Sequence, residues 1–130
     1  MVSITSGSRD NENLLRQLKR GDNLWIVVTG GKDYPDEWRL LQRINIQEVR
    51  EEHSEDEFPY HAIGNRKDSP KFDIAAQSNL TPLLHKLEFT SGKRIKADGR
   101  LIGCAVQTIR PLSDADIDLL QQYAKRLRTL

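Results

Sequence analysis

Apolar residues follow a strand-like pattern in three segments of the first half of the chain. Residues 24–29 (LWIVVT) are apolar or β-branched throughout, which predicts a central strand covered on both faces. Residues 2–5 (VSIT) alternate apolar with polar positions and predict a short first strand. Residues 38–49 (WRLLQRINIQEV) alternate in the same way after Gln42 and predict a further strand. A helix over residues 36–41 is the alternative for the start of that segment.

Two shorter apolar segments predict strands in the second half. Residues 58–64 (FPYHAIG) suit a short strand, and Pro59 favours the edge of a sheet because proline donates no backbone hydrogen bond. Residues 101–109 (LIGCAVQTI) are predicted to form a core strand that Pro111 ends.

The polar and apolar spacing predicts a first helix between residues 10 and 20. Asp10 or Asn11 can cap its start, and Gly21 can end it because glycine accepts a left-handed backbone at little cost. The apolar residues of this helix are Leu14, Leu15 and Leu18.

Two more helices have clear start signals. Thr81 and Pro82 begin a helix that runs through Leu87, since proline is preorganised for the first helical position. Ser113 and Asp116 have the spacing of a capping box at the start of the last helix. An apolar stripe at helical spacing continues that helix through Leu119, Leu120, Tyr123, Ala124 and Leu127.

The predicted element order is β-α-β-β-β-α-β-α within one domain of residues 1–130. Polar or glycine-rich connections occupy residues 30–37, 50–57 and 65–79. Strands and helices do not alternate regularly, so a doubly wound parallel sheet is disfavoured. The pattern favours an α+β fold in which a twisted or closed, mostly antiparallel sheet has helices packed around it.

Composition narrows the class of protein. The chain has 130 residues, 37% of them hydrophobic, and a net charge of +1. No apolar run approaches the roughly 20 residues of a membrane-spanning helix, and the first residues lack the pattern of a secretory signal. Cys104 is the only cysteine, so we expect a small core residue in a chain from a reducing, cytoplasmic setting.

The charges are unevenly distributed. Residues 47–57 carry six acids and one base, whereas residues 90–130 carry eight bases and four acids. Such asymmetry can steer an anionic partner to one face, although a solvated acidic loop and an ordinary mixed surface are the alternative interpretation.

Three pieces of the sequence together resemble the PUA-like superfamily, and within it the EVE and ASCH type domains. They are the N-terminal strand and helix, the turn and strand GDNLWIVV at residues 21–28, and the strand-to-helix unit of residues 100–120 with its Pro111-Leu112-Ser113 cap. The resemblance implies a PUA-like pseudo-barrel of mostly antiparallel strands with flanking helices, and a pocket that takes a nucleobase. The tryptophan- and asparagine-rich stretch usual after the first helix is absent here, so no complete aromatic cage is carried over.

The candidate base pocket combines two indoles with hydroxyl groups. An indole can stack on a base, and a hydroxyl can both donate and accept at a base edge. Strand-one hydroxyls are included because the resemblance places the end of that strand at the ligand. Core packing of the indoles and turn chemistry of the hydroxyls are the alternatives. The pocket residues are Ser3, Thr5, Ser6, Trp25, Thr29 and Trp38.

A basic segment supplies candidate phosphate contacts, with a solvated surface as its alternative. The basic patch contains Lys93, Arg94, Lys96, Arg100 and Arg110, and the predicted phosphate contacts are Lys93, Arg94, Lys96 and Arg100 together with Arg9. The histidines have no metal-ligand spacing, and no phosphate loop or nucleophile elbow occurs, so neither an enzyme nor a metal or cofactor is predicted.

We therefore expect a non-catalytic domain that binds DNA or RNA and recognises a modified or flipped base. One alternative is a protein-interaction module that uses the acidic residues 48–57 and the basic residues 93–110. The other is a small nucleotide-acting enzyme that uses His61 with a nearby carboxylate.

Overall fold

The sheet has five strands among the described residues, in the order β4-β3-β2-β1-β5. The structure, a computed structural model, describes residues 2–5, 17–51 and 60–130. Its strands are β1 (Val2–Thr5), β2 (Asn23–Thr29), β3 (Trp38–Glu51), β4 (Tyr60–Gly64) and β5 (Arg110–Pro111). Neighbouring strands run antiparallel except β1 and β2, which are parallel.

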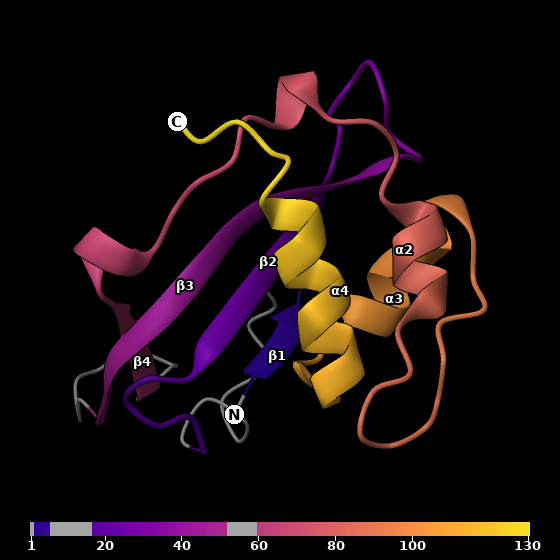
Figure 1. The fold of residues 1–130 in the computed structure, drawn as a ribbon. Coiled ribbons are helices and arrows are strands. Elements are labelled where there is room, and N and C mark those ends of the chain that lie inside the picture. Colours follow the sequence, from indigo (N-terminus) through magenta and orange to yellow (C-terminus); the bar gives the residue numbers. More distant parts are fainter. Residues whose placement is uncertain (1, 6–16, 52–59) are drawn as a thin grey trace.

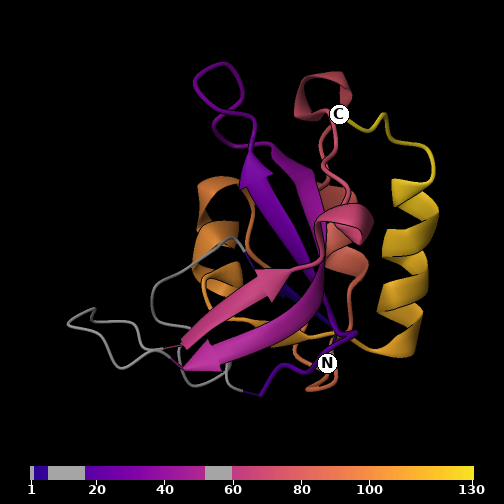
Figure 2. The same ribbon diagram turned by 90° about the vertical axis from the view of Figure 1, so that its left-hand side faces the viewer.

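The sheet is open, so the predicted closure into a pseudo-barrel is wrong. β4 and β5 lie at opposite ends of the strand order, and no pairing joins them among the described residues. Figure 1 places β4 at the end of the sheet far from α2 and α3, and the turned view of Figure 2 shows β4 and the end of β3 extending away from the helices. The α+β class is confirmed, since helices pack against a mostly antiparallel sheet.

Within the described residues three α-helices accompany the sheet, and two of them were predicted. They are α2 (Thr81–Lys86), α3 (Ile102–Val106) and α4 (Asp114–Ala124). α2 has its proline in the first turn, and α4 begins with the predicted capping box of Ser113 and Asp116. Short 3₁₀ helices also occur at η2 (Arg66–Asp68), η3 (Ile74–Ala76) and η4 (Gly99–Leu101).

The predicted core strand at residues 101–109 is wrong, because this segment forms the end of η4 and then α3. Ile102 and Val106 are four residues apart and both are fully buried, so one helical face supplies the apolar contacts. A short apolar run does not distinguish a buried strand from a buried helix. The same change exposes Cys104, which was expected in the core.

β3 begins at Trp38, so the alternative helix over residues 36–41 is also wrong. Its first half has hydrogen-bonded neighbours on both sides. β2 pairs with one edge of β3, and the irregular segment 69–80 runs along the other edge of β3. Along that second side the Trp38 carbonyl accepts from Leu80 N at 2.8 Å, and Leu41 accepts from Phe72 N at 2.9 Å.

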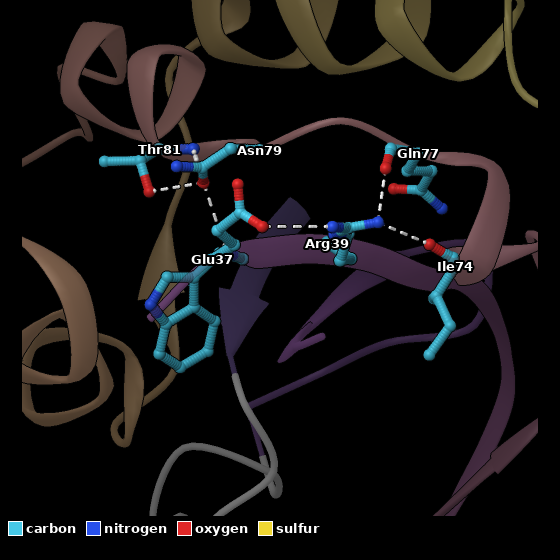
Figure 3. A network of polar contacts seen from close by, with 7 residues as sticks. Glu37, Arg39, Ile74, Gln77, Asn79 and Thr81 are labelled. Carbon is cyan, nitrogen blue, oxygen red and sulfur yellow. Dashed lines mark hydrogen bonds and ion pairs between the residues drawn. The ribbon is translucent and has the colours of Figure 1, made fainter. Parts of the chain in front are cut away.

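A polar network fastens this irregular segment to β3 (Figure 3). The buried guanidinium of Arg39 donates from Nη1 to the carbonyls of Ile74 and Gln77, and from Nη2 to Glu37 Oε2 at 3.3 Å. Asn79 Oδ1 accepts from Trp38 N at 3.2 Å and from Thr81 Oγ1 at 2.7 Å. The edge of β3 is therefore covered without a regular sixth strand there.

The core has two parts because successive strand residues point to opposite faces. Trp25 belongs to the larger cluster, which packs between the sheet and α2, α3 and α4 (Figure 1). Leu24, its neighbour, belongs to a smaller cluster with Leu18, Ile46 and Ile109.

The region of the first predicted helix is described only from residue 17 onward, where the chain forms a turn. Gly21 has the expected left-handed conformation, with φ +92°. None of the helices in the described ranges is long and apolar enough to cross a bilayer.

Candidate nucleic-acid interface

A hollow of about 790 Å³ opens where β3, β4 and η2 meet at the edge of the sheet. Four of its lining side chains are cationic: Arg43, Arg66, Lys67 and Lys71. Asp68 is the acidic side chain of its lining. We call this hollow the basic groove.

Local backbone pairing places Lys71 at the groove. Residues 69–72 run antiparallel to β3, where Arg43 N donates to Pro70 O at 3.2 Å and Gln42 pairs with Lys71 through an isolated bridge. The side-chain amide of Gln42 also donates to Ser69 O at 3.1 Å. One wall of the groove is thus attached directly to its strand.

The other cations are presented by the turn that follows β4. Asn65 caps η2 by accepting from Lys67 N at 3.0 Å, and this places Arg66 and Lys67 on an exposed turn. Gly64 permits the close approach before the turn, because a Cβ there would lie 2.7 Å from Ile44 Cγ2. A larger residue at position 64 would push η2 away from β3.

Arg43 is the anchored cation of the groove. Its Nη1 donates to Asn23 Oδ1 and its Nη2 to Asp68 Oδ1, both at 2.9 Å. The second oxygen of Asp68 accepts from Asn45 Nδ2 at 2.7 Å. The Arg43 hydrogen bond, followed by that of Asn45, lowers the pKa of Asp68, so this carboxylate is ionised at neutral pH.

Three groove cations stay unpaired once Asp68 has balanced Arg43. Arg66, Lys67 and Lys71 are exposed, and no ion pair engages them within the described parts of the chain. Cations grouped in one concavity attract an anionic ligand more strongly than the same charges spread over a convex surface.

A second hollow of about 380 Å³ adjoins the groove and shares Arg43 and Pro70 with it. It lies beside α4, which contributes Gln121 and Ala124, with Lys125 at the end of the helix, while the sheet side contributes Trp25 and Phe72. Trp25 is only 1% exposed, and its Nε1 has no hydrogen-bond partner in the described structure. We call this second space the aromatic hollow.

Trp38, a predicted base-pocket residue, lines neither hollow. Its indole is 4% exposed, packs in the larger core, and donates from Nε1 to Gly99 O at 2.9 Å. As the first residue of β3, it faces η4 and α3, and its ring lies 3.6 Å from the position of a Cβ on Gly103. The core-packing alternative is therefore the correct one for Trp38.

The remaining pocket residues are not brought together. Thr29 pairs with Trp38 at the end of β2, while Trp25 pairs with Arg43 nearer the groove. Ser3 and Thr5 lie in β1, but the structure describes only their backbone, and Ser6 lies outside the described residues.

The predicted phosphate contacts lie outside the basic groove. Arg94 pairs with Glu88 at 3.0 Å and Arg100 with Asp36 at 3.1 Å, whereas Lys93 and Lys96 are exposed. Arg9 is outside the described residues. Sequence reasoning missed Arg43, Arg66, Lys67 and Lys71, although the Asn65-Arg66-Lys67 turn after a strand was a usable signal.

The residues of the alternative functions are only partly described. His61 lies in β4, and only its backbone is placed. Of the acidic segment, Glu48 pairs with Arg50 at 2.6 Å, while residues 52–57 lie outside the description. Histidine, cysteine and acidic side chains form no group able to hold a metal in the portion that is described.

Comparison with protein-family models, curated proteins and solved structures gives no match. The similarity to PUA-like domains consequently stays a prediction from sequence, and function must be argued from the site itself.

Proposed function

We propose that this chain is a non-catalytic nucleic-acid-binding domain whose basic groove holds backbone phosphates. The observation that carries the proposal is the concentration of Arg66, Lys67 and Lys71, which have no ion-pair partner among the described residues, in one hollow beside the anchored Arg43. Lysine and arginine side chains neutralise phosphates and release counterions, which makes such binding sensitive to salt.

In this proposal the aromatic hollow binds a nucleobase. That base can be unmodified, modified or flipped out of a duplex. It adjoins the groove, so a nucleotide whose phosphate lies near Arg43 could direct its base toward Phe72. The Trp25 indole lines this hollow as part of its floor, since it is 1% exposed and its Nε1 is buried away from the opening. Stacking on an aromatic ring contributes about 1–3 kcal/mol per base. Trp25 keeps its place in this proposal, and Trp38 does not.

Binding of fluorescently labelled single-stranded DNA and RNA over a range of salt concentrations tests the proposal. The variant Arg66→Gln/Lys67→Gln/Lys71→Gln removes three groove charges. Because each phosphate contact of a single strand contributes about −0.7 to the slope of log K against log salt, the slope should become shallower by about two.

The matched control is Lys93→Gln/Arg94→Gln/Lys96→Gln, which removes the same number of charges from the surface predicted by sequence. We expect this control to bind almost as the parent protein does. If the control loses the slope and the groove variant keeps it, the phosphates lie on residues 93–96. If the parent protein binds no strand at low salt, the proposed function is wrong.

A further inference from the structure

The carboxylate of Asp68 is held like a bound anion. Its two oxygens accept from Arg43 Nη2 at 2.9 Å and from Asn45 Nδ2 at 2.7 Å. Arg43 and Asn45 are two residues apart in β3, so their side chains leave the same face of the strand. Two donors on a rigid strand therefore converge on one anionic group.

The Arg43 guanidinium does not depend on Asp68 alone for its position. Arg43 Nη1 is fixed independently by Asn23 Oδ1 at 2.9 Å, and the Arg43 side chain is 24% exposed. Asp68 is 53% exposed and ends the three-residue helix η2, outside the sheet. The Asp68 carboxylate can therefore be displaced, while the Arg43 guanidinium stays fixed on β3.

A phosphate can use the same donors. Guanidinium groups bind carboxylates and phosphates with the same paired geometry, and a side-chain amide donates equally well to either. Arg43 opens onto the basic groove, because it lines the groove beside Asp68, and Asn45 reaches the same place through its hydrogen bond to the Asp68 carboxylate. A phosphate in the groove therefore competes with Asp68 for Arg43.

We infer that Arg43 and Asn45 form a phosphate subsite that Asp68 fills in the free protein, and that a bound strand displaces the Asp68 carboxylate. This inference rests on the proposed function and adds a specificity residue to it. Asp68 acts as an internal competitor that weakens binding of single phosphates, while a strand with several phosphates on the neighbouring cations overcomes it.

The test compares Asp68→Ala with Asp33→Ala, a matched loss of one exposed acid in the loop between β2 and β3. An exposed ion pair shifts an equilibrium by about two- to fivefold, so Asp68→Ala should bind a labelled single strand tighter by that factor. Asp33→Ala should change affinity much less, because Asp33 does not line the groove and its loop follows the Thr29–Trp38 end of β2 and β3. Melting curves establish that both variants are folded.

A double-mutant cycle separates displacement from a general charge effect. In an Arg43→Gln background, Asp68→Ala should improve affinity no more than Asp33→Ala does. If Asp68→Ala and Asp33→Ala give equal gains with Arg43 present, while the parent protein binds the strand, the inference is overturned and the proposed function stands.

Pyrophosphate titration followed by NMR tests the subsite without a nucleic acid. We expect pyrophosphate to shift the Asn45 side-chain amide and the Arg43 Nε–H signals, and to do so at lower concentration in Asp68→Ala. Unchanged signals in Asp68→Ala would overturn the subsite. Shifted signals in a protein that binds no strand would support the subsite and contradict the proposed function.

Discussion

Gln77 and Leu40 are joined by two hydrogen bonds that imitate strand pairing. The Gln77 side chain accepts from Leu40 N at 2.8 Å through Oε1 and donates to Leu40 O at 2.7 Å through Nε2. Leu40 is fully buried and Gln77 is 7% exposed, so these backbone groups have little access to water. One side-chain amide thus provides the edge pairing that a regular strand would otherwise supply.

Gln77→Ala should destabilise the fold strongly. Truncation leaves the buried N–H and C=O of Leu40 without their partner, and each unsatisfied group costs about 1–3 kcal/mol. We expect a loss of roughly 2–4 kcal/mol in the free energy of unfolding, measured by urea denaturation. Ser78→Ala, an exposed neighbour, is the control and should be near neutral. A Gln77→Ala protein as stable as the control would show that water satisfies Leu40.

The sequence predicts a strand well where the pattern of apolar and polar residues stays regular along it. It predicts a strand poorly where the β2–β3 pairing changes register. β2 was predicted almost to the residue because 24–29 is apolar throughout. The start of β3 was ambiguous because a register shift occurs opposite Ile26 and Val27, which pair with Gln42 and Leu40. Leu41 is the extra residue, so two leucines follow each other and the alternation fails.

The site was less predictable than the fold. Arg43 and Arg66 are 23 residues apart in sequence and meet only because β4 pairs with β3 and Gly64 allows the following turn. The high density of lysine and arginine in residues 93–100 predicted phosphate contacts there instead. In the structure, Arg94 and Arg100 of that segment are in ion pairs. A high density of cationic residues along the chain does not predict a high density of cationic groups in space when the site is assembled across neighbouring strands.

Asp116→Asn should lower stability more than its position on a helix suggests. Asp116 is fully buried, and besides its capping role it accepts from Glu88 N and Phe89 N, both at 2.8 Å. Phe89 has a left-handed backbone, with φ +58°, which these bonds hold in place.

The asparagine amide would turn one acceptor into a donor that faces backbone N–H groups. We expect a loss of about 2–3 kcal/mol in the free energy of unfolding from thermal and urea denaturation. Asp114→Asn, at an exposed position of the same first turn, should cost only about 0.3–1 kcal/mol through the helix dipole. Equal losses in the two variants would contradict the role assigned to the Asp116 contacts.

The titration of Asp68 should respond to Arg43. The folded-state pKa of Asp68 lies below the usual 3.8, first because of the Arg43 hydrogen bond and then because of that of Asn45. A depressed carboxyl pKa contributes stability above the unfolded value of 3.8 that is lost as pH falls through the folded value.

In Arg43→Gln, the pKa of Asp68 should rise toward 3.8, as measured by ¹³C NMR of its carboxyl carbon. Asn23→Ala, which leaves the Arg43–Asp68 pair in place, is the control and should raise it less. An unchanged Asp68 titration in Arg43→Gln would mean that the pair does not persist in solution. Binding should not vary through this group near pH 7, because Asp68 stays ionised there.

Trp38→Phe separates the structural role of an indole from a binding role. The substitution removes the Nε1 donor to Gly99 O and leaves a smaller ring in a site that is 4% exposed. We expect a loss of about 1–3 kcal/mol in the free energy of unfolding, from the cavity and the unsatisfied carbonyl.

Affinity for a labelled single strand should be unchanged under conditions where the Trp38→Phe variant is fully folded, because Trp38 lines neither hollow. Trp25→Phe is the counterpart: it shortens the ring that forms the floor of the aromatic hollow, so it should weaken binding of the strand. A Trp38→Phe protein that keeps its stability but loses affinity would return this indole to the binding surface, and would mean that the base lies at the η4 end of the sheet rather than beside α4.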